Sequence, residues 1–446
     1  MSSIKSTVLL LSLAALLLPG KAVSQEQLSY MEALQIGLEH NFDIRVVATE
    51  QQINENNVTL GNAGFLPTVD ARGTRTFSEN NSRQEFATGP DRIRTGATSN
   101  NLNSSVNLNW VVFDGLGMFI NLERLKALEK SGQLLTKETI ERALSNITAS
   151  YYEVARQAYK IEALQDAIAI SEARVEIAQA QYEVGVSAKV EILRAQVDYN
   201  ADRSELLLQQ EALQNAKINL NQLLGRNPDI NFVVTDSIVV DTSLKYDAVD
   251  NGLYASNPLL QRLQLDRQLA SLDLKAIRAS RFPTIGIISA FNFTRSEAEP
   301  LNEFSARFNQ NRGYNYGLSV NLPIFNGFNI NRQAQNARIN QEIASLEYQR
   351  VENQLQADVA RAYSQYTNRL QLLDLEESNV KLAQENAAIA LERYKLGLLT
   401  AIELREAQRN ELIASNRLID IRYQAKAAET QLKYITSTLR QGINLP

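Results

Sequence analysis

Val106–Gly115 reads Val-Asn-Leu-Asn-Trp-Val-Val-Phe-Asp-Gly, and Leu318–Gly327 reads Leu-Ser-Val-Asn-Leu-Pro-Ile-Phe-Asn-Gly. In both segments apolar residues alternate with polar residues until a Gly ends the pattern, as expected for a β-strand with one apolar and one polar face. The same strand and the same strand end therefore occur once in each half of the chain.

The repetition extends over most of the chain. Tyr30–Pro67 and Tyr246–Pro283 have Tyr, Asn and Pro in step. Two Tyr-x-x-Gly segments begin at Tyr182 and Tyr394, and the number of residues between them is the same as between the two strand ends. Between Tyr30–Pro67 and Tyr246–Pro283 this number is slightly larger. Matched Tyr, Pro and Gly at separate places indicate an internal duplication, in which the two copies differ by a short insertion.

Each copy contains a pair of strands, at about 66–112 and about 283–325. Alternating strands of about ten residues with aromatic ends fit a membrane-crossing sheet, but they also fit a half-buried hairpin of a soluble sandwich. The polar segments at about 80–101 and 296–312 favour the membrane, because long loops are usual outside a bacterial barrel. The polar strand faces would then line a water-filled lumen, with these residues: Asn107, Asn109, Asn315 and Asn321.

A sheet of four strands has two open edges. In hydrocarbon each unpaired N–H or C=O group costs several kcal/mol, and the smallest usual barrels have about eight strands. If these strands cross a membrane, several copies of the chain must therefore combine their strands in one barrel.

The rest of the sequence is predicted to be helical. No Pro occurs between Gly115 and Gly185 or between Gly327 and Gly397, and about 70 residues at 1.5 Å each give a helix about 100 Å long. Apolar residues recur with a period of about 3.5, which indicates helices that supercoil on one another. A shorter helix returns after Gly185 and again after Gly397, so we expect two antiparallel helical hairpins with these glycines at their tips.

The segment Met1–Ser24 has the features of a secretory signal peptide. Lys5 precedes an apolar run, Thr7–Leu18, and the small residues of Ala22–Ser24 provide a cleavage site. The run is too short to span a bilayer. We therefore expect the mature chain to work outside the cytoplasm.

Composition excludes several chemistries. The net charge of -5 argues against a broad basic surface for nucleic acid. The chain has no Cys and a single His, His40, which excludes cysteine nucleophiles, disulfides and the usual Cys/His zinc sites. It also lacks the Gly-x4-Gly-Lys-Ser/Thr phosphate loop. We expect no cofactor and no metal, and we expect a partner to supply the energy for any transport.

Three kinds of motif recur in order in both copies: Phe65–Thr68 and Phe282–Thr284 where helix passes into strand, Val112–Gly115 and Leu322–Gly327 where strand passes into helix, and the turns that begin at Tyr182 and Tyr394. Over nearly the whole mature chain, this order resembles the TolC family of outer-membrane efflux proteins.

The resemblance implies a mainly α fold with a β-barrel part. In that family, three protomers each give four membrane strands to one 12-stranded barrel, and long coiled helical hairpins form a periplasmic tunnel. The resemblance also implies a homotrimer in the lipid of the outer membrane, with a periplasmic adaptor (membrane fusion) protein and an inner-membrane transporter as partners. We expect a signal peptide at 1–24, repeats at 25–225 and 245–441, a connector at 226–244 and a tail at 442–446.

Four residues mark the junctions between helix and strand: Pro67, Gly115, Pro283 and Gly327. Pro cannot donate a hydrogen bond to a helix or a ladder, so it suits a boundary where a helix must stop. We interpret all four as turn residues without contact to cargo.

The tips of the helical hairpins are the candidate functional site. TolC-like proteins close their periplasmic end through Tyr and carboxylate contacts and carry acidic rings there. By motif position the resemblance gives these roles to Tyr394, Glu403 and Glu406, with Glu191 as a partner of Tyr394, and Tyr182 begins the equivalent turn in the first copy. Plain packing of the Tyr side chains and simple solvation of the Glu side chains are the alternatives.

One residue departs from the best-known family pattern. Leu399 stands two positions after the tip glycine Gly397, where that pattern has a basic residue. In the first copy this position is Ser187. The gate contacts that depend on the basic group are therefore not carried over to this chain.

We predict an outer-membrane channel of a tripartite efflux or type I secretion system, a passive gated conduit for small molecules or exported protein, and not an enzyme. A periplasmic coiled-coil adaptor would share the helical hairpins but would lack the alternating strands. A secreted glycan-active enzyme would hold its carboxylates on loops around a pocket, whereas most carboxylates here lie on periodic helices. The sequence does not identify the cargo.

Overall fold

The computed structural model describes residues 26–299 and 306–440, so the predicted signal peptide and the predicted C-terminal tail lie outside the described residues. These residues form two compact units. The helical unit comprises 26–46, 139–257 and 355–440, and the sheet unit comprises 47–138, 258–299 and 306–354. The two longest helices, α5 (Gly117–Glu183) and α9 (Asn329–Lys395), each have residues in both units.

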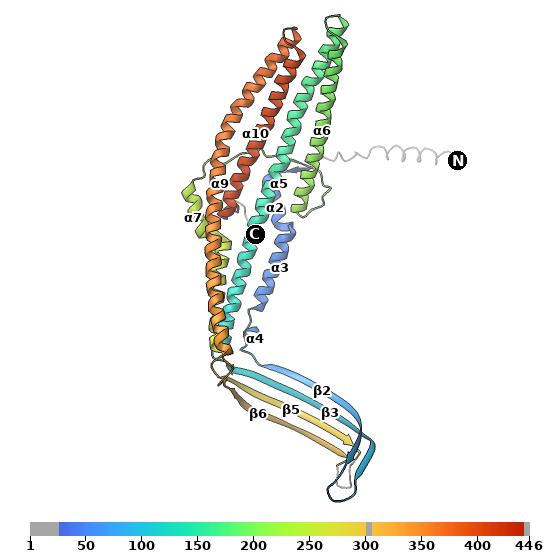
Figure 1. The fold of residues 1–446 in the computed structure, drawn as a ribbon, viewed down its shortest axis with the longest axis vertical. Helices are drawn as coiled ribbons and strands as arrows, with labels where there is room; N and C mark the ends of the chain where they lie inside the picture. Colours follow the sequence, from blue (N-terminus) through green and yellow to red (C-terminus); the bar gives the residue numbers. More distant parts are fainter. Residues whose placement is uncertain (1–25, 300–305, 441–446) are drawn as a thin grey trace, which may run out of the picture. The chain divides into compact units, whose positions relative to one another are not determined.

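The sheet unit contains one antiparallel sheet of four strands in the order β2-β3-β5-β6, which lie side by side in Figure 1. Their bounds are Thr68–Gln84 for β2, Arg92–Phe113 for β3, Thr284–Ala298 for β5 and Phe308–Asn321 for β6. Among the described residues, each of the two outer strands, β2 and β6, has one unpaired edge.

The register places apolar residues on one face of the sheet. Trp110 pairs with Ile287, which pairs with Leu318, and residues opposite one another in antiparallel strands share a face. A mostly polar row lies on the other face: Asp70, Asn107, Ala290 and Asn315. The alternation predicted from the sequence thus holds in register across neighbouring strands of the sheet.

The strands are longer, and the loops shorter, than the sequence predicted. The polar segments that we expected to be loops at about 80–101 and 296–312 lie partly in strands, because β2 continues to Gln84 and β3 already begins at Arg92. β5 likewise continues to Ala298, and β6 begins at Phe308. Backbone hydrogen bonds continue a hairpin whatever its side chains are, so the change to polar residues marks the end of the apolar surface and not the end of the strand.

Three further helices belong wholly or mostly to the sheet unit: α3 (Phe42–Asn57), α4 (Leu60–Ala63) and α8 (Pro258–Ala279). β2 begins just after Pro67 and β5 just after Pro283, as the junction interpretation requires. Trp110, the only Trp of the chain, donates its indole N–H to the carbonyl oxygen of Phe65 at 2.9 Å. This hydrogen bond joins β3 to the segment that follows α4.

The two junction glycines both have left-handed backbone conformations, with φ of +70° at Gly115 and +65° at Gly327. Gly115 is also restricted by space, because a Cβ there would lie 2.5 Å from the carbonyl oxygen of Ala279. At Gly327 nothing lies within 4 Å of an added Cβ, so only the backbone angle favours Gly there.

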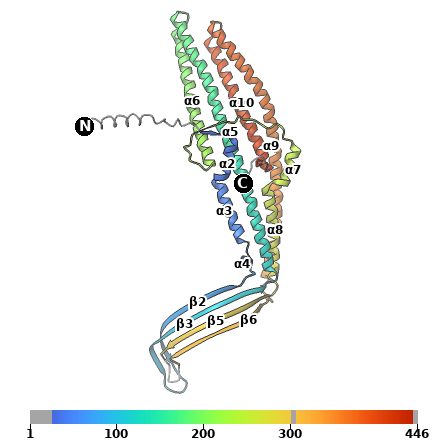
Figure 2. The same ribbon diagram turned by 180° about the vertical axis from the view of Figure 1, so that it is seen from behind.

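The helical unit contains two helical hairpins. α5 is followed by α6 (Lys189–Leu223), and α9 is followed by α10 (Ala401–Ile435). In both views α6 lies beside α5 and α10 beside α9 (Figures 1 and 2). Shorter elements complete the unit: α2 (Tyr30–His40), α7 (Tyr246–Ser256), and the parallel strands β1 (Glu26–Leu28) and β4 (Phe232–Val234).

The core of the helical unit joins segments that are distant in the sequence. Leu28, Leu34, Ile147, Leu220 and Phe232 are all almost fully buried in one cluster, and each comes from a different element. Burying such a side chain contributes about 1.5–3 kcal/mol.

None of the helices in the described part of the chain has the length and apolar content of a membrane-spanning helix.

The asparagines that match between the two copies anchor the ends of the returning helices. Asn41, between α2 and α3, donates its side-chain N–H to the carbonyl oxygen of Leu223 at 2.7 Å and accepts the N–H of Ile44 at 3.1 Å. Asn257, between α7 and α8, donates in the same way to the carbonyl oxygen of Ile435 at 2.8 Å. Both side chains are buried, and both carbonyl groups end a helix, which explains why the repeat keeps Asn at this place.

Asn41→Ala and Asn257→Ala should each lower the free energy of unfolding by about 1–3 kcal/mol, because each leaves a buried carbonyl group without a donor. The measurement is thermal unfolding of the purified full chain by circular dichroism. Asn353→Ala, at an exposed position of α9, is the matched control and should leave the unfolding temperature unchanged or slightly raised. Equal behaviour of all three variants would contradict the anchoring role.

Candidate functional site

The tips of both helical hairpins have the same backbone turn. In the first, Gly185 N–H donates to the carbonyl oxygen of Tyr182 at 2.9 Å and Val186 N–H donates to that of Gln181 at 2.9 Å. In the second, Gly397 and Leu398 make the equivalent bonds at 3.0 and 2.9 Å. These are Schellman turns, which need a residue with positive φ, and φ is +81° at Gly185 and +71° at Gly397. The glycines predicted to be tip residues thus form these turns.

The helices that leave the two tips begin differently. At α10, Thr400 and Glu403 form a capping box: the Glu403 carboxylate accepts the Thr400 N–H at 2.9 Å, and the Thr400 hydroxyl accepts the Glu403 N–H at 3.3 Å. At α6 the corresponding residue is Ala188, which makes no side-chain cap, and Glu191 pairs with Arg194 at 2.9 Å. The hydrogen bonds from the Thr400 side chain and backbone lower the pKa of Glu403.

The two tip tyrosines lie in different surroundings. Tyr394 is 5% exposed and packs with Leu404, Ala407 and neighbouring apolar residues, which include the partly buried Leu399. Tyr182 is 44% exposed. Burial raises the pKa of Tyr394, the nearby Arg174 opposes this, and the charge of Glu191 adds to it. Among the described residues no hydrogen bond joins Glu191 to Tyr394.

A cavity of about 400 Å³ lies beside the tips, which we call the tip cavity. It brings together two of the predicted site residues, Glu191 from α6 and Glu406 from α10. Glu403 and the two tyrosines do not line it. Arginines from three helices share this cavity with the carboxylates: Arg174, Arg194, Arg405 and Arg409.

An ion-pair network that the sequence analysis missed connects α5, α6 and α10. Arg405 binds Asp202 through two hydrogen bonds of 2.8 Å. Arg174, which is 2% exposed, pairs with Asp198, and Ser171 donates its hydroxyl to Asp202. Paired contacts of Arg with carboxylates are among the stronger polar contacts in proteins. The like charges of Asp198 and Asp202, four residues apart on α6, were the available signal, because such a pair is unfavourable without cations nearby.

Apolar side chains are exposed at both tips. Val184 and Val186 are each 74% exposed at the first tip, and Leu396 is 73% exposed at the second. Leu398 and Ile402 are also exposed. Adjacent exposed apolar side chains usually mark a surface that another protein covers.

One four-stranded sheet with an apolar and a polar face, together with two long helical hairpins, is the combination that the sequence analysis expects of an outer-membrane channel. The model of the family described as "Outer membrane efflux protein" matches residues 33–226 and 251–438. The chain therefore belongs to the outer membrane efflux protein family.

Individual relatives agree with this assignment. The chain is 23% identical over 417 residues to the cation efflux system protein CusC of Escherichia coli O157:H7, which covers 89% of this chain and 83% of CusC. It is 20% identical over 444 residues to the outer membrane protein TolC of Salmonella enteritidis, which covers 96% of this chain and 86% of TolC. The solved structure of the Campylobacter jejuni CmeC outer membrane channel has the same fold, with a TM-score of 0.76, 14% identity, and coverage of 94% of this chain and 87% of CmeC.

These findings confirm the predicted family, the mainly helical fold with its membrane sheet, and the location in the outer membrane. The protein is an outer-membrane channel of efflux or secretion systems. Its family consists of transport components, and members work with periplasmic adaptors and inner-membrane transporters.

The difference between the helix caps predicts opposite effects of two substitutions. Thr400→Ala should destabilise the start of α10 by about 1 kcal/mol, and Ala188→Thr should stabilise the start of α6 by about 0.5–1 kcal/mol, because Thr would then stand three residues before Glu191. Amide hydrogen exchange at residues 401–404 and 189–192 measures both effects locally.

At acid pH, Thr400→Ala should destabilise the start of α10 less than at neutral pH. The pKa of Glu403 is lowered in the folded protein, so the stability that this carboxylate contributes is present at neutral pH and is lost as the pH falls through its pKa. The difference in exchange rate between Thr400→Ala and the unmodified chain should therefore become smaller at acid pH, where only the bond from the Glu403 N–H to the Thr400 hydroxyl is left. Thr400→Ser, which keeps the hydroxyl, is the control; a loss as large as that of Thr400→Ala would contradict the capping role.

Proposed function

We propose that the chain acts as a homotrimer whose strands close one 12-stranded barrel, and that this assembly is a passive gated conduit and not an enzyme. The open edges of β2 and β6 carry this proposal. Each edge has a row of backbone groups that hydrocarbon would leave without hydrogen bonds. Pairing β2 of one copy with β6 of the next removes every edge once the ring closes.

The polar face of the sheet suits the lining of a water-filled lumen. Its residues include Thr68, Asp70, Asn107, Asn315 and Asn321, whereas the other face carries Trp110, Ile287 and Leu318. Alternation of this kind suits a wall with water on one side and lipid on the other.

The duplicated order of elements supports our further proposal that the chain consists of two repeats, 25–225 and 245–441, joined by the connector 226–244.

We also propose that the tips form the periplasmic gate. Leu399, which replaces the basic residue of the best-known family pattern, is part of the apolar cluster around Tyr394. This packing supports a gate held by apolar contact in addition to the charges of the tip cavity. Glu191, Glu403 and Glu406 would be repeated in each of three copies and would favour cations, in keeping with the name of the relative CusC.

The exposed apolar side chains of the tips would bind the partner complex. A periplasmic adaptor that covers Val184, Val186 and Leu396 would remove their apolar surface from water. An inner-membrane transporter would then supply energy and select the cargo.

The trimer can be tested with introduced cysteines, because the chain has no Cys of its own. Thr74→Cys on β2, combined in turn with Gly317→Cys, Ser319→Cys or Asn321→Cys on β6, should give disulfide-linked species of up to three chains in outer-membrane fractions. Each single variant is the control and should not give the three-chain species. A full panel without cross-links, together with a monomeric mass of the detergent-extracted protein, would contradict the shared barrel.

The acidic tip predicts an effect on ion selectivity. Glu403→Gln combined with Glu406→Gln should reduce the preference for cations, measured as the reversal potential under a KCl gradient in planar bilayers. Gln is chosen because it can still occupy the capping-box position. Glu205→Gln, at an exposed position of α6, is the matched control. Unchanged selectivity in the double variant would reject the acidic role of the tips and would leave the trimer proposal untouched.

A further inference from the structure

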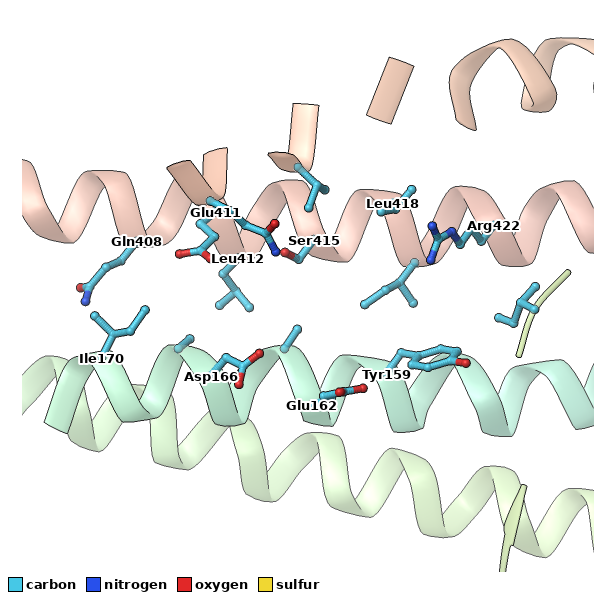
Figure 3. A pocket seen from close by; sticks show the side chains of 16 residues that line it. Tyr159, Glu162, Asp166, Ile170, Gln408, Glu411, Leu412, Ser415, Leu418 and Arg422 are labelled. Carbon is cyan, nitrogen blue, oxygen red and sulfur yellow. The ribbon is translucent and has the colours of Figure 1, made fainter. Parts of the chain in front are cut away.

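A second cavity lies within the helical unit between α5 and α10, has no lining residue in common with the tip cavity, and we call it the α5–α10 cavity (Figure 3). Its volume is about 220 Å³. The residues that line it recur at helical spacing on both helices, so the two helices face each other here without filling the space between them. The ones that matter for its chemistry are Asp166, Ile170, Gln408, Glu411, Leu412 and Ser415.

Gln408 is a buried amide without a partner. The residue is 4% exposed, and within the described residues neither its side-chain nitrogen nor its side-chain oxygen has a hydrogen bond. In Figure 3 its side chain extends from α10 toward Ile170 of α5, into the space between the helices. A buried amide that makes no hydrogen bond is unfavourable and uncommon, so this group fits a site that a ligand completes.

Three carboxylates line the same cavity without a cationic partner. Glu162 and Asp166 belong to α5 and Glu411 belongs to α10, and no ion pair involves any of them in the described part of the chain. The guanidinium at the far end of the cavity, on Arg422, pairs with Glu377 at 2.9 Å. Figure 3 shows Asp166 and Glu411 on facing helices. Burial and the charge of Asp166 together raise the pKa of Glu411.

The surroundings fit an organic cation better than a metal ion. No group of three or more Asp, Glu or His side chains in the described residues is placed to hold a metal. The walls between the polar groups are apolar, with Ile170, Leu412 and Leu418. A ligand with an ammonium group and an apolar body matches both features, because its charge needs carboxylates and its body needs apolar contact.

We propose that the α5–α10 cavity binds a small organic ammonium ion, with the ammonium group between Asp166 and Glu411, the apolar body against Ile170 and Leu412, and a polar atom at the amide of Gln408. This site lies within the helical unit, and none of the residues that line it is assigned to the proposed gate. It therefore adds a ligand site to the channel and does not depend on ion selectivity at the tips.

The test uses the purified full chain in detergent with a matched pair of probes. One probe is 2-phenylethylammonium, and the other is 2-phenylethanol, which has a similar shape and no charge. Isothermal titration should show saturable binding of the ammonium probe and at least tenfold weaker binding of the alcohol. Asp166→Asn combined with Glu411→Gln should weaken binding of the ammonium probe at least tenfold, because both charges are removed and the shape is kept.

Three further variants make the result specific. Glu211→Gln, at an exposed position of α6 that does not line the cavity, should bind like the unmodified chain. Ala167→Leu should weaken binding without a change of charge, because it fills the cavity. Glu403→Gln with Glu406→Gln should keep full binding.

The outcomes separate the proposals. Absence of saturable binding, equal binding of the alcohol, or full binding by the Asp166 and Glu411 double variant would overturn the cavity site. Binding that is lost only in the tip variant would also overturn it, and would place the cation at the gate. Circular dichroism verifies that each variant is folded. If the double variant does not fold, Glu411→Gln alone and Ala167→Leu decide the question by the same criterion.

Discussion

The backbone of a membrane sheet must find all of its hydrogen bonds within the protein. Hydrocarbon offers no donors or acceptors, so each unpaired group at an edge is strongly unfavourable. Among the described residues the constraint acts on two strands, β2 and β6, which have neighbours on one side only. The long ladders between the four strands satisfy the interior of the sheet, and the proposed trimer would satisfy its edges. The proposal of a shared barrel rests on this sheet being too small to close by itself.

The two halves of the chain share their framework and differ at the tips. Asn41 and Asn257 anchor the ends of α6 and α10 by the same hydrogen bond, and the Schellman turns at Gly185 and Gly397 are equivalent. Beyond those turns the two copies differ in helix caps, in tyrosine burial and in charge. In the proposed assembly both hairpins would pack in one wall and so need the same backbone geometry, whereas the side chains at the tips would only have to suit the proposed partners.

The sequence predicted those features that depend on local pattern. Alternation identified the sheet, and Gly and Pro marked the junctions, because each of these signals acts within a few residues. The capping box of Thr400 and Glu403 was readable as Thr-x-x-Glu, but the acidic-ring interpretation of Glu403 concealed it. The observed loops between the strands are shorter than the predicted ones, because a change to polar side chains does not end a strand and the ladder continues to Gln84.

The sequence does not predict which residues of helices far apart in the chain contact one another. The bond between Arg405 and Asp202 joins residues 203 positions apart, and it depends on how far α10 is displaced along α6. Heptad spacing indicates that helices pack together, but it leaves that displacement open by whole turns. The same holds for the α5–α10 cavity, where a shift of one turn would change which residues of α10 face those of α5.

Trp110 has a practical consequence for spectroscopy. It is the single indole of the chain, and its N–H is bound to the carbonyl oxygen of Phe65, where a strand meets the end of a helical segment. Intrinsic fluorescence of the unlabelled protein excited near the red edge of absorption therefore originates at this one junction in each copy. Emission wavelength and quenching report on the local contact between β3 and the segment that follows α4, with no dye attached.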